Sequence, residues 1–150
     1  VRQAGNDPLG YLKGHSIPAV HVGSSSSATI NSDITGTFDG TTGDLDGALN
    51  SPLEIVSVNY NSSLKRVTID INDGRGPQTM ADNIEAFNLR YFDKLGAETT
   101  VSADVTAVRV EMTAATDRPD RRTGKQNSVT LRSDVFIRSK SFDMFAIPGR

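Results

Sequence analysis

The residues of this chain that could do chemistry are two histidines, with no cysteine to serve as a nucleophile. His15 and His21 both lie in an irregular stretch near the start of the sequence. Hydrolysis by a triad needs a base held beside a positioned nucleophile, and no Gly-x-Ser-x-Gly turn occurs in the chain. The two histidines also lack an acidic or thiolate partner at metal-ligand spacing. The sequence therefore predicts no catalytic residues and a protein that is not an enzyme.

An acidic, glycine-rich loop over residues 39–52 is the other place where a ligand could bind. Calcium prefers several carboxylate and carbonyl oxygens on one flexible loop. The EF-hand pattern fails here, because Thr42 and Leu53 stand where it requires acidic residues. Two interpretations stay open: a plain Asp and Gly turn without a cofactor, or a weak calcium site. The residues that would carry calcium are Asp39, Asp44 and Asp46.

The charge balance limits the class of partner. Lys and Arg total 16 against 18 Asp and Glu, so no strong field exists to hold a polyanion, and nucleic acid is not an expected partner. A loop over residues 116–127 does carry local positive charge, and no aromatic residues stand beside that charge for bases to stack on. A solvated basic loop is the favoured interpretation of its four cations, Arg118, Arg121, Arg122 and Lys125.

The elements that must position these loops have the two-residue apolar period of β-strands. Val56, Val58 and Tyr60 share one face, a turn follows at residues 61–63, and the next run alternates again, which predicts a hairpin. Three later runs alternate in the same way, and a turn at residues 93–96 follows the first of them. Their apolar positions are Phe87, Leu89 and Tyr91; Val108, Val110 and Met112; and Val129, Leu131, Val135 and Ile137. A strand is also predicted at residues 28–38, but its pattern is less regular because the apolar residues recur every four positions instead of every two.

These runs predict an α+β, mostly β fold: one domain over residues 1–150, with an antiparallel sheet of four to six strands preceded by a helix stub. We expect the sheet region at residues 28–140, an irregular loop at 9–27 and a tail at 141–150. The stub would be the last turn of a helix, capped by Gly5 in the left-handed conformation. Its residues are Val1, Arg2, Gln3 and Ala4.

Several segments, taken in order, are similar to those of a known family: the opening VRQAGNDP, and then MADNIEAFNLRYFD through Gly96. They resemble a PilW-type minor pilin of type IV pili, in which the first segment corresponds to the end of the N-terminal helix and the second to the central strand and turn. VTAVRVEMT, the Arg-Pro loop at residues 118–120 and the closing run at 129–138 continue the likeness. Each motif alone is degenerate, but the ordered set covers nearly the whole chain. The J-type pseudopilins of type II secretion are similar too.

The resemblance implies a pilin-like head whose long apolar N-terminal helix anchors it in the inner membrane and then packs in a filament. The resemblance implies that this helix and its processing site would precede Val1, and we expect that the helix was either removed or encoded as a separate chain. The implied function is that of a structural subunit, outside the cytoplasm, that contacts other major and minor pilins or pseudopilins during filament assembly or at the tip. The alternative is a secreted adhesin or carbohydrate-binding β-domain. The polar loops at residues 39–52 and 116–127 favour this alternative.

Overall fold

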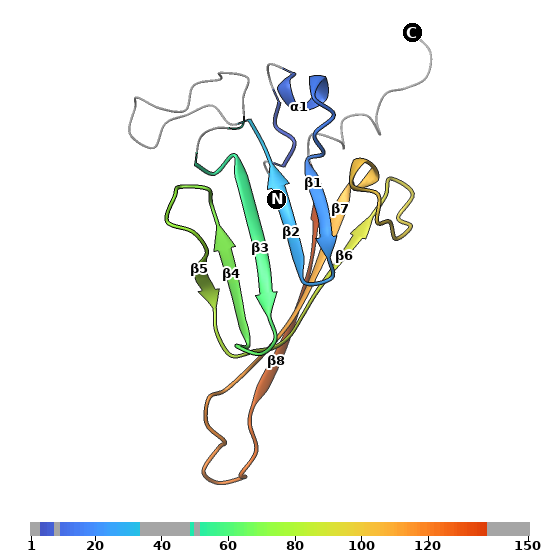
Figure 1. Cartoon of the computed structure of the whole chain (residues 1–150). Helices are drawn as coiled ribbons and strands as arrows, with labels where there is room; N and C mark the ends of the chain where they lie inside the picture. The colour runs from blue at the N-terminus through green and yellow to red at the C-terminus, as the bar shows by residue number, and fades with distance from the viewer. Residues whose placement is uncertain (1–3, 8–9, 34–48, 50–51, 138–150) are drawn as a thin grey trace.

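The structure is a computed structural model that describes residues 4–7, 10–33, 49 and 52–137. Its described elements form two antiparallel sheets, one in front of the other in Figure 1, with one short helix at their upper end. The first sheet has the order β1-β2-β3-β4-β5 and the second the order β6-β7-β8. In chain order the elements are α1 (Tyr11–Gly14), β1 (Val20–Ser24), β2 (Ser27–Asn31), β3 (Ile55–Asn61), β4 (Arg66–Asp70), β5 (Gln78–Ala81), β6 (Ile84–Phe92), the 3-10 turn η1 (Ser102–Asp104), β7 (Ala107–Ala115) and β8 (Ser128–Phe136).

The first sheet contains the hairpin that the sequence predicts. β3 pairs with β4 so that Val58 lies opposite Ile69 and Tyr60 opposite Val67, which places the alternating apolar residues on one face. The turn between them is closed by Asn61, whose Oδ1 accepts a hydrogen bond of 3.0 Å from the Leu64 N–H. Turn chemistry and apolar register agree here, and the predicted hairpin is confirmed.

The second sheet uses the three later runs of alternating residues. β6 and β7 place Leu89 opposite Val110 and Tyr91 opposite Val108, and β8 continues the same rows on the far side of β7. The predicted turn at residues 93–96 is confirmed, since Gly96 has a φ of 78° and Asp93 Oδ1 accepts the N–H groups of Leu95 and Ala97.

The core lies between the two sheets. Its buried residues are Ala4, Ala19, Val20, Ala28, Leu89, Tyr91, Val105, Val108 and Ile137. Backbone bonds also join the sheets, because β6 donates from the Leu89 N–H to the Ser25 carbonyl at 2.7 Å and from the Ile84 N–H to the Lys65 carbonyl at 2.9 Å. Tyr91 adds a side-chain link, since its hydroxyl lies 3.0 and 2.9 Å from the carbonyls of Ser24 and Ser27 in the β1–β2 turn. The mostly β, antiparallel fold class is thus confirmed, with the strands divided between two sheets instead of one.

The prediction of an irregular loop over residues 9–27 is wrong. This segment contains α1 and all of β1, which pairs with β2 through Val20 opposite Ile30 and Val22 opposite Ala28. The tract of four serines conceals the hairpin, because it supplies the turn itself and Ser27 already belongs to β2. The strand prediction at residues 28–38 is confirmed as far as Asn31, and residues 34–38 lie outside the described part.

The predicted helix stub falls mostly on residues that the structure does not describe: Val1, Arg2 and Gln3 lie outside. Ala4 is described and is 1% exposed within the core. Gly5 has the expected left-handed conformation, with a φ of 72°, and its N–H donates to the Asn31 carbonyl at 2.7 Å. Among the described residues, no helix is long and apolar enough to cross a bilayer.

The Tyr91 hydroxyl yields a test of the contact between the sheets. Burial raises the pKa of this phenol from its ordinary value of 10.0 to about 12. Above pH 10 the unfolded chain loses the phenolic proton while the folded chain keeps it, so stability falls as the pH rises from 10 toward 12. Tyr91→Phe should lower the free energy of unfolding at pH 7 by about 1–2 kcal/mol, because the Ser24 and Ser27 carbonyls lose the one phenolic proton that they share.

The same variant should also flatten the decline in stability above pH 10. Urea unfolding followed by circular dichroism measures both effects. A Tyr91→Phe protein with wild-type stability at pH 7 and an unchanged alkaline decline would contradict this role of the hydroxyl.

Candidate interaction surface

The two histidines stand on separate elements. His15 follows α1, where its Nδ1 lies 2.9 Å from the Tyr11 carbonyl oxygen and its ring centroid lies 4.2 Å from that of Tyr11. His21 is exposed on β1 and lies opposite Thr29 of β2. His15 therefore contacts the short helix that it follows, and His21 lies on the β1–β2 pair.

The three aspartates of the calcium prediction, Asp39, Asp44 and Asp46, lie outside the described residues, so that site stays a prediction. Two acidic side chains at either end of that segment are described. Asp33 and Glu54 are both 0% exposed, and the Ser32 N–H, next to Asp33, donates to the Glu54 carbonyl at 2.9 Å. Within the described part, no three His, Asp or Glu side chains come together as a metal site.

The most distinctive surface feature is a groove between the two sheets, with a volume of about 240 Å³. All the residues that line it are apolar. From the first sheet they are Val20, Ala28, Ile30, Val58, Val67, Met80 and Ala81, and from the second Phe87, Leu89, Val108, Val110 and Met112. Met80 at its edge is 64% exposed. Large apolar surface open to water is typical of a site where another element docks.

Sequence reasoning placed several of these residues on strand faces, but it assigned Val20 to a loop and missed the groove. The alternation shows that Val58, Val110 and Met112 lie on the apolar faces of their strands. It does not show how far the apolar face of one sheet lies from that of the other. Four of the lining residues, Val20, Ala28, Leu89 and Val108, also belong to the core. The groove therefore continues the core into a region where side chains no longer fill the space between the two sheets.

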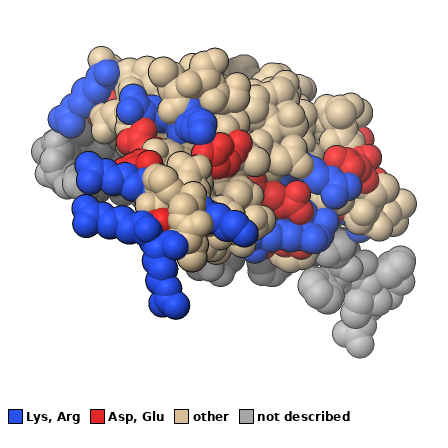
Figure 2. All heavy atoms as spheres, turned by 90° about the horizontal axis from the view of Figure 1, so that it is seen from below, with Lys and Arg blue, Asp and Glu red and all other residues tan. Residues whose placement is uncertain are grey.

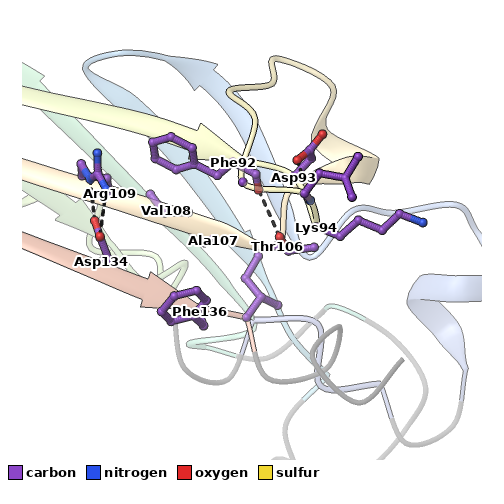
Figure 3. A pocket seen from close by; sticks show the side chains of 12 residues that line it. Phe92, Asp93, Lys94, Thr106, Ala107, Val108, Arg109, Asp134 and Phe136 are labelled. Atoms are coloured by element: carbon purple, nitrogen blue, oxygen red, sulfur yellow. Dashed lines mark hydrogen bonds and ion pairs between the residues drawn. The ribbon is translucent and has the colours of Figure 1, made fainter. Parts of the chain in front are cut away.

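A second hollow, of about 370 Å³, lies on the outer face of the second sheet (Figure 3). Phe92 and Phe136 flank Ala107 in one cross-strand row, so two rings stand on either side of a small residue. Arg109 closes one side, with its guanidinium carbon 4.9 Å from the centre of the Phe92 ring. Arg109 also donates two hydrogen bonds, of 2.7 and 3.0 Å, to Asp134.

This ion pair keeps the hollow largely neutral. The hydrogen bond from Arg109 lowers the pKa of Asp134, so the carboxylate stays ionised and continues to hold the guanidinium. Lys94 also lines the hollow. The arrangement suits an apolar group flanked by polar contacts, and it offers no nucleophile and base in hydrogen-bond contact.

The third feature is the long connection between β7 and β8, residues 116–127, which projects beyond both sheets (Figure 1). The Thr116 N–H donates to the Asn127 carbonyl at 2.9 Å and closes its base. Asp120 orders the tip, because one carboxylate oxygen accepts from the N–H groups of Arg122 and Thr123 and from the Thr123 hydroxyl. These bonds lower the pKa of Asp120. The predicted loop is thus a hydrogen-bonded hairpin.

Like Lys13 and Lys94, the hairpin cations differ from six other described cations, which lie on the strands or in the turns beside them. Lys65, Arg66, Arg75, Arg90, Arg109 and Arg132 each form an ion pair with a carboxylate. Among the described residues, the four hairpin cations form no such pair, and all four are exposed. Figure 2, which views the molecule from this end, shows long Lys and Arg side chains extending away from the surface.

Comparisons with protein-family models, with curated proteins and with solved structures find no match to this chain.

The role of Asp120 can be tested with trypsin, which cleaves after Arg and Lys. Asp120→Ala removes the acceptor for three donors, so the tip should open more often and cleavage within residues 116–127 should become several-fold faster. Mass spectrometry of timed digests measures the rate. Asp117→Ala is the matched control: it also removes one loop carboxylate, but no described donor bonds to it, and its rate should stay near that of the wild type. Equal rates for all three proteins would show that Asp120 does not order the tip.

Proposed function

We propose that this domain is the β-rich head of a filament subunit, a minor pilin of the PilW type or its pseudopilin relative. It acts outside the cytoplasm through contacts with other pilins, in filament assembly or at the tip, and a long apolar N-terminal helix attaches it to the membrane. Its work is structural, without catalysis and without a required cofactor. The ordered sequence motifs support this proposal, and one structural observation carries it.

That observation is the wholly apolar groove between the sheets. A groove lined by residues such as Val58, Val110 and Met112 is costly to leave in water, at about 25 cal/mol for each Å² of apolar surface. An apolar helix packs against a sheet with its side chains in such a hollow, and it satisfies its own backbone hydrogen bonds. A helix of the kind that the resemblance implies is therefore a suitable occupant.

The start of the described chain supports the same occupant. Ala4 is buried in the core together with Val20, Ala28, Leu89 and Val108, the four core residues that also line the groove. The Gly5 N–H is bonded to the Asn31 carbonyl at the end of β2, so Ala4 and Gly5 are held beside the first sheet. In this proposal a helix that ends at Ala4 continues directly along the groove.

A complementation assay tests the proposal. In the source organism, loss of the gene should reduce surface or pseudopilus filaments by at least about tenfold, counted by electron microscopy, and the wild-type gene should restore them. Met80→Glu places a charge at the edge of the groove and should fail to restore them, because a buried helix would leave that carboxylate without water.

Thr79→Glu is the matched control. It adds the same charge to the neighbouring, exposed position of β5, whose side chain points to the opposite face, and it should restore filaments. Met80 is 64% exposed in the domain, so neither variant should alter folding, which circular dichroism can check. Normal filament numbers after loss of the gene would overturn the proposal.

A further inference from the structure

The outer edge of β8 is an open strand edge. β8 is nine residues long, pairs only with β7 within the described sheets, and keeps an unbroken register from Ala107 opposite Phe136 to Ala115 opposite Ser128. Eight of its nine residues are exposed, all except the half-buried Val135. A long, regular edge strand with free backbone groups is a template for pairing with another strand.

The register shows which backbone groups are free. The Ile137 N–H donates to Thr106 and the Thr116 N–H to Asn127, so the odd-numbered positions of this strand face β7. The N–H and C=O groups of the even-numbered residues therefore point away from the sheet. These residues are Ser128, Thr130, Arg132, Asp134 and Phe136.

The other described edges are bonded, short or irregular. The Leu89 and Ile84 N–H groups of β6 already bond to Ser25 and Lys65, and the Tyr91 carbonyl accepts from Thr99. β1 is a short strand whose Val22 N–H donates to Ser102 Oγ at 2.9 Å. β5 has four residues and an irregular register with β4. β8, by contrast, is long and contains no proline and no bulge, and its two charged residues, Arg132 and Asp134, are paired with Glu111 and Arg109 of β7.

The surroundings of β8 specify the chemistry of a partner. Val129 and Leu131 are 61% and 57% exposed, and they lie opposite Ala114 and Met112 on the groove side of the sheet. On the other face, Arg132 and Asp134 are paired with Glu111 and Arg109. The hairpin cations, which carry no such pairs in the described part, stand at the Ser128 end of the strand.

We propose that β8 binds a partner protein by strand addition, with the partner's strand pairing along the free edge and its acidic residues meeting the basic hairpin. Alternate side chains of that strand are apolar, so that they cover Val129 and Leu131. Strand addition to β8 depends on three contributions. Backbone pairing gives affinity, apolar contact sets the register, and opposite charge sets the orientation of the partner strand. This binding mode depends on β8 and the hairpin alone and not on the proposed function.

The test uses a synthetic peptide, as long as β8, in which valine and glutamate alternate, with binding followed by fluorescence anisotropy of an attached dye. The peptide should bind, and raising the salt concentration should weaken binding. A version with lysine in place of glutamate should bind at least about tenfold more weakly because it meets like charge. A version methylated on alternate backbone nitrogens should not bind, because it cannot pair.

Variants of the domain separate the contributions. Thr130→Pro removes an outward N–H without breaking the ladder to β7 and should abolish binding, whereas Thr130→Val keeps that N–H and should bind like the wild type. Changing the four hairpin cations to alanine should weaken binding about tenfold or more and remove most of its salt dependence. Thermal unfolding checks that the variants fold.

Three results would overturn the proposal. One is absence of peptide binding at low salt. Another is heparin binding that is stronger than peptide binding and unaffected by Thr130→Pro, which would make the hairpin a plain polyanion site. The third is dimerisation of the domain itself through β8, detected by analytical ultracentrifugation and lost in Thr130→Pro, which would make a second copy the occupant.

Discussion

The contact between the inner faces of the two sheets is the constraint on which this molecule depends. Each sheet has one apolar face, and neither can be stable in water unless that face is covered. Tyr91 and Leu89 of β6 join the second sheet to the β1–β2 turn by side-chain and backbone hydrogen bonds, and the buried core forms behind this contact. The sheets cover each other only in part, so the same contact that builds the core also leaves the apolar groove beside it.

The positions of the exposed features follow from this arrangement. The edge of β6 is used in joining the sheets, and β8, two strands away, keeps its edge free. The β7–β8 hairpin extends past the sheets because both strands run on beyond the region in which the sheets pack (Figure 1). The groove, the β8 edge and the basic hairpin thus lie around a single packing contact.

Much of the fold was predictable because strand alternation and turn chemistry are local. The β3–β4 hairpin, the runs that became β6, β7 and β8, and the left-handed Gly96 were all identified from neighbouring residues. The β1–β2 hairpin was missed because its turn is a serine tract that resembles a linker, and its pairing is recognised only when Val20 lies opposite Ile30. The hairpin cations were visible in the sequence, but the absence of ion pairs among the described residues was not, since pairing depends on which side chains from other strands come near.

The sequence by itself determined the class of fold, the faces of most strands and the location of the charged and turn-forming loops, because each of these depends on residues within a few positions of one another. Tertiary structure alone decided that the strands divide into two sheets, that the sheets leave a groove between them and that, within the described residues, β8 pairs on one side only. These features depend on the distance between strands far apart in the chain, and the two-residue alternation specifies the direction of a side chain but not what stands opposite it.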